Sequence, residues 1–72
     1  MPKFPVLKPR ELISAFKKMD FELIRISGSH YHLKKSDKLV TIPYHNRDLR
    51  IKTLKLIFNQ ASISIEELKK YL

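Results

Sequence analysis

All three histidines of the chain and its only glycine fall in two short stretches. His30 and His32 follow Gly28, and His45 closes the run Val40-Thr41-Ile42-Pro43-Tyr44-His45. Imidazole is the side chain that takes up and releases a proton near neutral pH without help from its surroundings. The chain has no cysteine, so a disulfide and a thiolate metal site are both excluded. Proton transfer by histidine is therefore the chemistry that these residue types indicate.

The spacing around His30 predicts a strand with two different faces. Side chains in a strand alternate between the faces of a sheet, so His30, His32 and Lys34 share one face. Tyr31 and Leu33 then point the other way, toward a core. Two imidazoles and an ammonium group are thus expected on one surface.

Length and charge restrict the class of protein. A chain of 72 residues forms one small domain with a narrow margin of stability. Its formal net charge of +8 favours a polyanionic partner, with nucleic acid ahead of an acidic protein and a membrane surface third. A charge that serves only solubility is the alternative. No apolar run approaches the ~20 residues of a membrane span, and Met1–Leu7 has no signal-peptide block, so we expect a cytoplasmic protein.

The N-terminal part predicts an arm followed by a helix. Pro2 and Pro5 deny backbone donors to regular structure, so residues 1–7 are expected to form an extended arm and residues 8–72 the single domain. Pro9 suits the first position of a helix. Apolar side chains then recur at helical spacing, and the helix should end near Met19 or Asp20: Leu12, Ile13, Phe16 and Met19.

Three strands and two further helices are expected downstream. The strands span Phe21–Ile26, His30–Lys34 and Leu39–Ile42, and the short turns between them make all three antiparallel neighbours. A second amphipathic helix follows, with its core face formed by Ile51, Leu54, Ile57, Phe58 and Ala61. Ser64 and Glu67 have the spacing of a capping box, which starts a short last helix carrying Leu68, Tyr71 and Leu72.

This order predicts an α+β domain of two layers. Two helices would cover one face of a three-stranded antiparallel sheet and leave the other face open. The arrangement α-β-β-β-α, with a short extra C-terminal helix and a basic surface, resembles the double-stranded-RNA-binding (dsRBD-like) fold. His30 and His32 should lie on the open face.

The motifs of the chain narrow this further, because it resembles the HicA family of toxin–antitoxin mRNA interferases. The resemblance covers about Lys8 to Leu68 and rests on Glu11-Leu12-Ile13, Phe21, Gly28-Ser29-His30, Val40-Thr41-Ile42-Pro43-Tyr44-His45, and Thr53-Leu54 through Gln60-Ala61. It implies a metal-independent endoribonuclease that cleaves mRNA, needs no cofactor and is neutralised by a HicB-type antitoxin. It also implies that His30 is the catalytic residue.

The chain departs from the family pattern at three positions. Asp20 and Ser62 stand where glycine often ends the helices, and Lys52 precedes Thr53 where glycine is frequent. These departures affect the geometry of the helix ends more than the chemistry.

RNA cleavage without a metal needs a base for the 2′-hydroxyl proton and cations for the phosphate. We expect His30 to act as base or acid, with Gly28 and Ser29 letting the phosphate approach. His32 and His45 are alternatives for a second acid or base, or are binding or solvated residues. A metal site is not expected, because two imidazoles without a nearby carboxylate are a poor ligand set.

Further side chains are expected to contact RNA: Arg25, Lys34, Lys35, Lys38, Tyr44, Arg47 and Arg50. The antitoxin should present an acidic surface that covers the His30 face. Two other functions stay open from the sequence. One is a non-catalytic RNA-binding module, and the other is a protein-interaction domain with an acidic partner.

Overall fold

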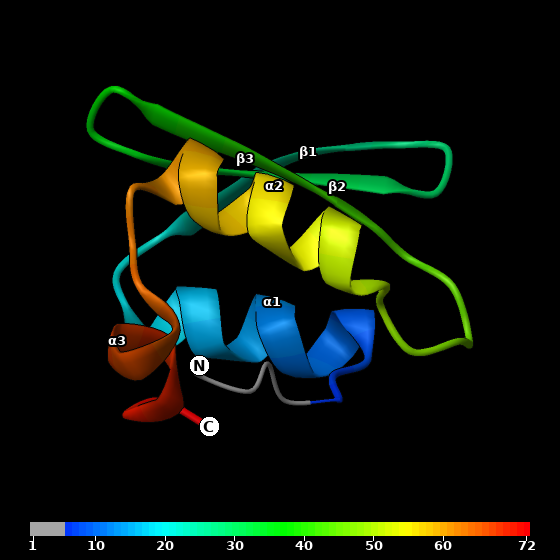
Figure 1. Cartoon of the computed structure of the whole chain (residues 1–72). Coiled ribbons are helices and arrows are strands. Elements are labelled where there is room, and N and C mark those ends of the chain that lie inside the picture. The colour runs from blue at the N-terminus through cyan, green and yellow to red at the C-terminus, as the bar shows by residue number, and fades with distance from the viewer. Residues whose placement is uncertain (1–5) are drawn as a thin grey trace.

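Six elements follow one another in a computed structural model that describes residues 6–72. They are α1 (Pro9–Lys18), β1 (Glu22–Ser27), β2 (His30–Lys35), β3 (Lys38–Pro43), α2 (Ile51–Ala61) and α3 (Ile65–Lys69). The three strands form one antiparallel sheet in the order β1-β2-β3 (Figure 1). The predicted α+β class and element order are confirmed. Most of the expected arm, residues 1–5, lies outside the described residues.

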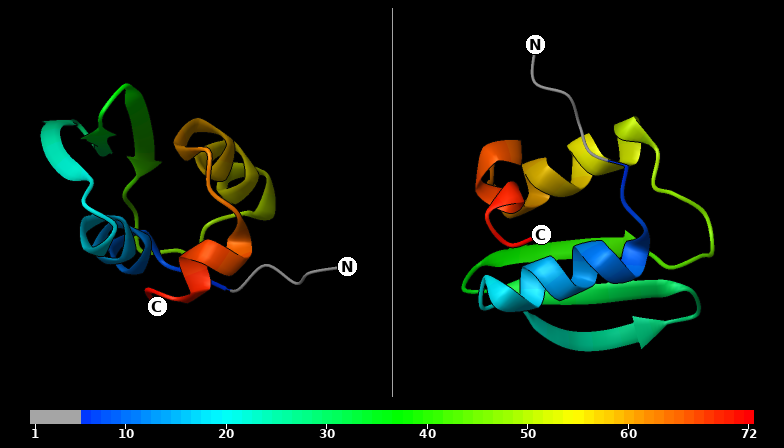
Figure 2. Two further views of the ribbon diagram at one scale, coloured as in Figure 1. Left: turned by 90° about the vertical axis from the view of Figure 1, so that its left-hand side faces the viewer. Right: turned by 90° about the horizontal axis from the view of Figure 1, so that it is seen from below.

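The long helices occupy one side of the sheet. In the left view of Figure 2, α1 lies beneath the strands and α2 lies next to β3, with no described element above the strands. The right view, from below, shows α1 in front of the sheet and α2 alongside β3. The core between them consists of fully buried apolar side chains from α1, β2, β3 and α2, the largest being Phe16, Leu12, Leu33, Ile42, Leu54 and Ile57. This arrangement leaves one face of the sheet open, as the alternation in β2 predicted.

Local signals in the sequence determine where the helices begin and end. The backbone N–H of Lys8 donates to Glu11 Oε1 at 3.0 Å, and Ser64 Oγ accepts from the N–H of Glu67 at 3.2 Å. Asp20 and Ser62 follow α1 and α2 with φ of 72° and 56°. Both residues, at positions where the resemblance leads one to expect glycine, therefore still adopt the left-handed conformation that ends a helix, at some steric cost.

The edge of β3 is closed by α2. The backbone N–H of Thr41 donates to Gln60 Oε1 at 3.3 Å. A side chain of α2 thus satisfies an edge donor that would otherwise be open to another strand. At the opposite edge, β1 contains a bulge, because Ile24 is inserted between Leu23 and Arg25.

Several details of the sequence interpretation differ from the structure. Each strand extends one residue beyond the expected C-terminal end, β1 starts one residue later than expected, and β3 starts one residue earlier. Ile51 was expected on the core face of its helix but is 57% exposed. Leu49 is buried instead, and its N–H donates to the carbonyl of the buried Leu7 at 2.7 Å, so the loop fills this end of the core. Tyr71 and Leu72 follow α3 and are exposed.

Candidate functional site

His30 begins the central strand directly after a two-residue hairpin loop. Gly28 in this loop has φ of 59°, and a Cβ built there would meet no atom within 4 Å. A positive φ at the first loop residue matches the twist of a tight hairpin and favours glycine. His30 pairs with Ser27 of β1 and Pro43 of β3, and its side chain is exposed. The imidazole therefore lies at one end of the sheet with open space beside the loop.

His32 lies on the same face as His30 and is held in place. Its Nδ1 and Thr41 Oγ1 are hydrogen-bonded at 3.1 Å. The His32 side chain is half-buried. Arg25 pairs with His32 from the neighbouring strand. The predicted grouping of His30 and His32 on one face is confirmed, and Arg25 joins them there.

The cations of the open face lie at different distances from His30. Arg25 is the diagonal cross-strand neighbour of His30, and in an antiparallel pair two such residues lie about 7–8 Å apart. Lys34 is four residues further along β2, which corresponds to about 13 Å at roughly 3.3 Å per residue. Arg25 is therefore nearer to His30 on this face than Lys34 is.

Tyr44 and His45 lie at the same end of the sheet but beside the helices. The N–H of Tyr44 donates to the carbonyl of Ser29 at 2.6 Å, which ties this segment to the His30 hairpin. The Tyr44 ring stacks on Tyr31, with ring centres 4.7 Å apart and planes at 22°. His45 Nδ1 accepts from the N–H of Arg47 at 3.2 Å. His45 therefore belongs to the loop after β3 and not to the open face.

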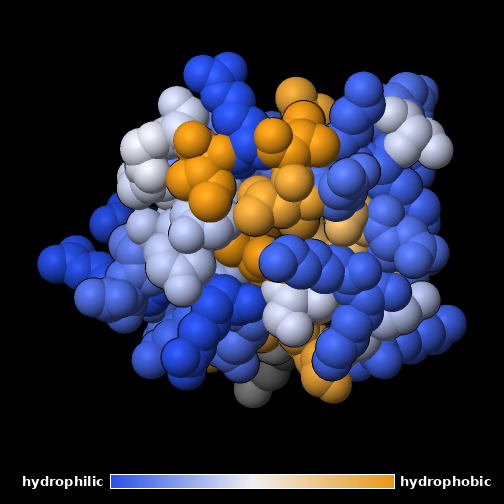
Figure 3. Space-filling model, turned by 180° about the vertical axis from the view of Figure 1, so that it is seen from behind, coloured by the Kyte–Doolittle hydropathy of each residue, from blue (hydrophilic) through white to orange (hydrophobic). Residues whose placement is uncertain are grey.

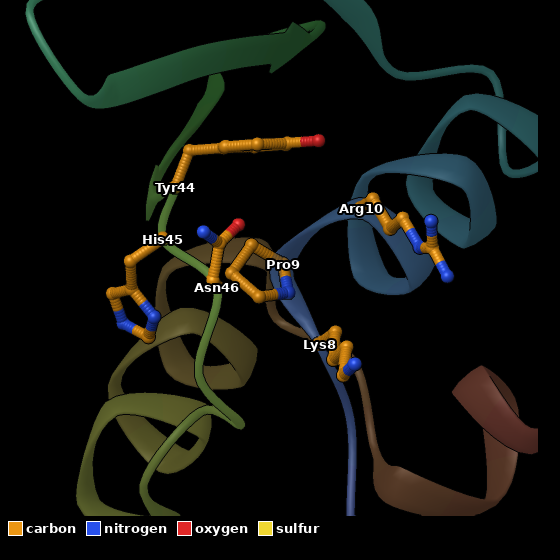
Figure 4. A pocket seen from close by; sticks show the side chains of 6 residues that line it. All are labelled: Lys8, Pro9, Arg10, Tyr44, His45 and Asn46. Atoms are coloured by element: carbon orange, nitrogen blue, oxygen red, sulfur yellow. The ribbon is translucent and has the colours of Figure 1, made fainter.

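A hollow opens beneath Tyr44. It has a volume of about 230 Å³ and is lined by Lys8, Pro9, Arg10, Tyr44, His45 and Asn46 (Figure 4). Lys8, Arg10 and Asn46 were not singled out from the sequence. No sequence signal joins the start of α1 to the end of β3, since the two segments are more than thirty residues apart.

The remaining predicted RNA contacts lie away from His30. Lys35 and Lys38 face each other at the far end of β2, and Lys35 Nζ lies 5.8 Å from the centre of the Phe21 ring. Arg47 and Arg50 line a separate hollow of about 480 Å³ with His45, Asp48 and Thr53. The fold thus distributes the expected cations over three regions.

The described residues contain neither a metal-binding cluster nor a membrane-spanning helix. Within residues 6–72, no three His, Asp or Glu side chains come together in a way that could hold a metal ion. The helices of this part of the chain are too short and too polar to cross a bilayer.

Comparison with known proteins agrees with the resemblance seen in the motifs. The family model described as the HicA toxin of bacterial toxin–antitoxin systems matches residues 9–63 of the 72-residue chain. The matched range includes the His30 hairpin, both long helices and all three strands. A search of curated proteins gave no match. Membership of such a family implies an antitoxin partner. The chain belongs to the HicA toxin family.

Proposed function

We propose that the protein is a toxin that cleaves mRNA in the cytoplasm without a metal, with His30 as the catalytic residue, and that a HicB-type antitoxin neutralises it. The observation that carries this proposal is the placement of His30. Its exposed imidazole stands at the open end of the sheet, beside an unobstructed glycine loop and within reach of Arg25.

The chemistry follows from these groups. His30 accepts the proton of a ribose 2′-hydroxyl, and the 2′-oxygen forms a bond to the adjacent phosphorus. The bond from phosphorus to the 5′-oxygen breaks, and that oxygen takes up a proton from a second acid. His32 is the better placed of the two other histidines for this role, because it shares the face with His30 whereas His45 does not. Arg25 supplies positive charge as the phosphate gains negative charge.

The open face also suits a protein partner. Ile24 and Leu39 are each 51% exposed and lie beside the cations Arg25 and Lys34. Figure 3 shows apolar atoms gathered within a strongly hydrophilic surface on the side of the molecule where β1 lies. Apolar patches with a polar rim are typical of interaction sites. An acidic antitoxin that covers this face would block His30.

The test is cleavage of single-stranded RNA by the purified protein in the presence of a chelator. His30→Ala should lower the cleavage rate by about 100-fold or more, the usual contribution of a general acid or base. His45→Ala is the matched control for loss of a histidine, and we expect a much smaller effect. RNA binding and the melting temperature should stay close to wild type in His30→Ala, because the side chain is exposed.

Other outcomes would contradict the proposal. Wild-type protein that binds RNA without cleaving it would favour the non-catalytic module. Full cleavage by folded His30→Ala would remove the catalytic assignment. Adding a HicB-type antitoxin should suppress cleavage, and a complex that leaves His30 open to solvent would contradict the proposed inhibition.

A further inference from the structure

We propose that the hollow beneath Tyr44 binds one base of the RNA, next to the nucleotide that His30 attacks, and that it influences where the RNA is cut. This inference rests on the proposed ribonuclease function. The site would be separate from the open face, and Tyr44 would be its stacking surface.

The Tyr44 ring has one occupied and one available face. Tyr31 covers the first face in the stacked pair with 4.7 Å between ring centres. Figure 4 shows the ring edge-on, with Asn46 and Pro9 on the side of the hollow. Tyr44 is 37% exposed. The ring is therefore held by a neighbour while part of its surface faces the hollow.

The composition of the hollow matches a nucleotide. Aromatic rings bind single-stranded RNA by stacking on bases, and every base offers such a face. The side-chain amide of Asn46 has donors and an acceptor for the edge of a base. Lys8 and Arg10 provide positive charge for the flanking phosphates. With about 230 Å³, the hollow is smaller than the roughly 300–1,000 Å³ of sites for drug-sized ligands, which favours a single base.

The backbone connects this hollow to the catalytic end of the sheet. The N–H of Tyr44 donates to the carbonyl of Ser29, the residue before His30. His30 itself pairs with Pro43, the residue before Tyr44. The hollow and the imidazole are therefore on opposite sides of the same sheet end. A strand of RNA that passes around this end would place one nucleotide at His30 and a neighbour at Tyr44.

The first experiment measures binding apart from cleavage. The probe is a fluorescent single-stranded RNA with 2′-O-methyl groups, which lacks the attacking hydroxyl. Tyr44→Ala should raise the Kd about tenfold, the size expected for loss of one stacked base. Tyr44→Phe keeps the ring, so its Kd should stay within about twofold of the wild-type value. Tyr71→Ala is the matched control, because Tyr71 is 36% exposed and lies beyond α3. Equal Kd values for Tyr44→Ala and Tyr71→Ala would overturn the proposal.

The second experiment maps cut positions in a pool of RNAs with random sequence. Asn46→Ala should change the base preference at one position beside the cut while the total rate stays within about fivefold, since contacts to one base edge are worth about 1–3 kcal/mol. An unchanged preference together with unchanged binding by Lys8→Ala would count against the hollow. Both side chains are exposed, so these variants remain informative if Tyr44→Ala fails to fold.

The two proposals fail in different ways. If the wild type cleaves RNA and the Tyr44 and Asn46 variants behave like it, the hollow is not a base site and the ribonuclease stands. If the wild type does not cleave RNA but Tyr44→Ala loses affinity for the 2′-O-methyl probe, the base site stands and the catalytic role of His30 is wrong. If the wild type neither cleaves RNA nor binds the probe, both are wrong.

Discussion

The two ends of strand β2 have similar loops but different surroundings. Each end is joined to its neighbour by a two-residue turn whose first residue has a positive φ, 59° at Gly28 and 55° at Ser36. The first turn leads into His30 and lies beside the stacked tyrosines. The second is flanked by Lys35 and Lys38. Both ends carry positive charge, but a histidine and a stacked tyrosine pair occur at the first end. Charge alone therefore does not locate the candidate site.

The two turns also show what glycine contributes. Ser36 adopts nearly the same φ as Gly28, so a tight hairpin in this sheet does not require glycine. A side chain at Gly28 would have open space, since nothing lies within 4 Å of a Cβ there. The absence of a side chain at Gly28 keeps the surface beside His30 clear, which the proposed approach of a phosphate at this end would need.

The largest effect, on the rate of RNA cleavage, should come from exchanging the histidine and the lysine at positions 30 and 34 of β2. His30→Lys combined with Lys34→His keeps the composition and keeps both residues on the open face of β2. Cleavage should fall at least about 100-fold, because the proposed general base would be lost from the end that holds Arg25, Gly28 and the hollow. The rate of RNA cleavage checks this, with Lys34→His alone as the control. Retained cleavage in the double variant would mean that the two ends are chemically equivalent.

A moderate effect is expected on stability from the first turn. Gly28→Ala should lower the free energy of unfolding by about 1 kcal/mol, since alanine pays the left-handed cost that glycine avoids. Ser36→Ala is the matched variant and should change it by less than about 0.5 kcal/mol, because serine already pays this cost. Thermal unfolding should then show a drop of about 4–8 °C for Gly28→Ala. Equal shifts for both variants would show that the turns are under the same strain.

The smallest effect concerns the cations at each end. Arg25→Ala should reduce the dependence of log K on log salt for single-stranded RNA by about 0.7, the value for one lost phosphate contact. Lys38→Ala removes the same charge at the far end, and we expect a smaller change for a short RNA. Binding titrations at several salt concentrations measure both slopes. Identical slopes would indicate that the RNA runs along the whole sheet.

The sequence was sufficient to predict the order of the elements and the two faces of β2. Proline at the start of α1, the Ser64 and Glu67 cap, and the alternation from His30 to Lys34 all act within a few residues, so they can be recognised without a fold. The same motifs indicated the HicA family, which the family model confirmed over residues 9–63. The roles of His30 and of the predicted RNA contacts stay predictions.

Only the tertiary structure decided which distant side chains meet. It joined Gln60 to the edge of β3, buried Leu7 beside Leu49, and formed a hollow from the segments 8–10 and 44–46. It also separated Lys35 and Lys38 from His30 by the length of a strand. Such contacts depend on how the helices pack against the sheet, and packing is set by the shapes of many apolar side chains together. The spacing of residues along the chain therefore does not predict which distant side chains come into contact.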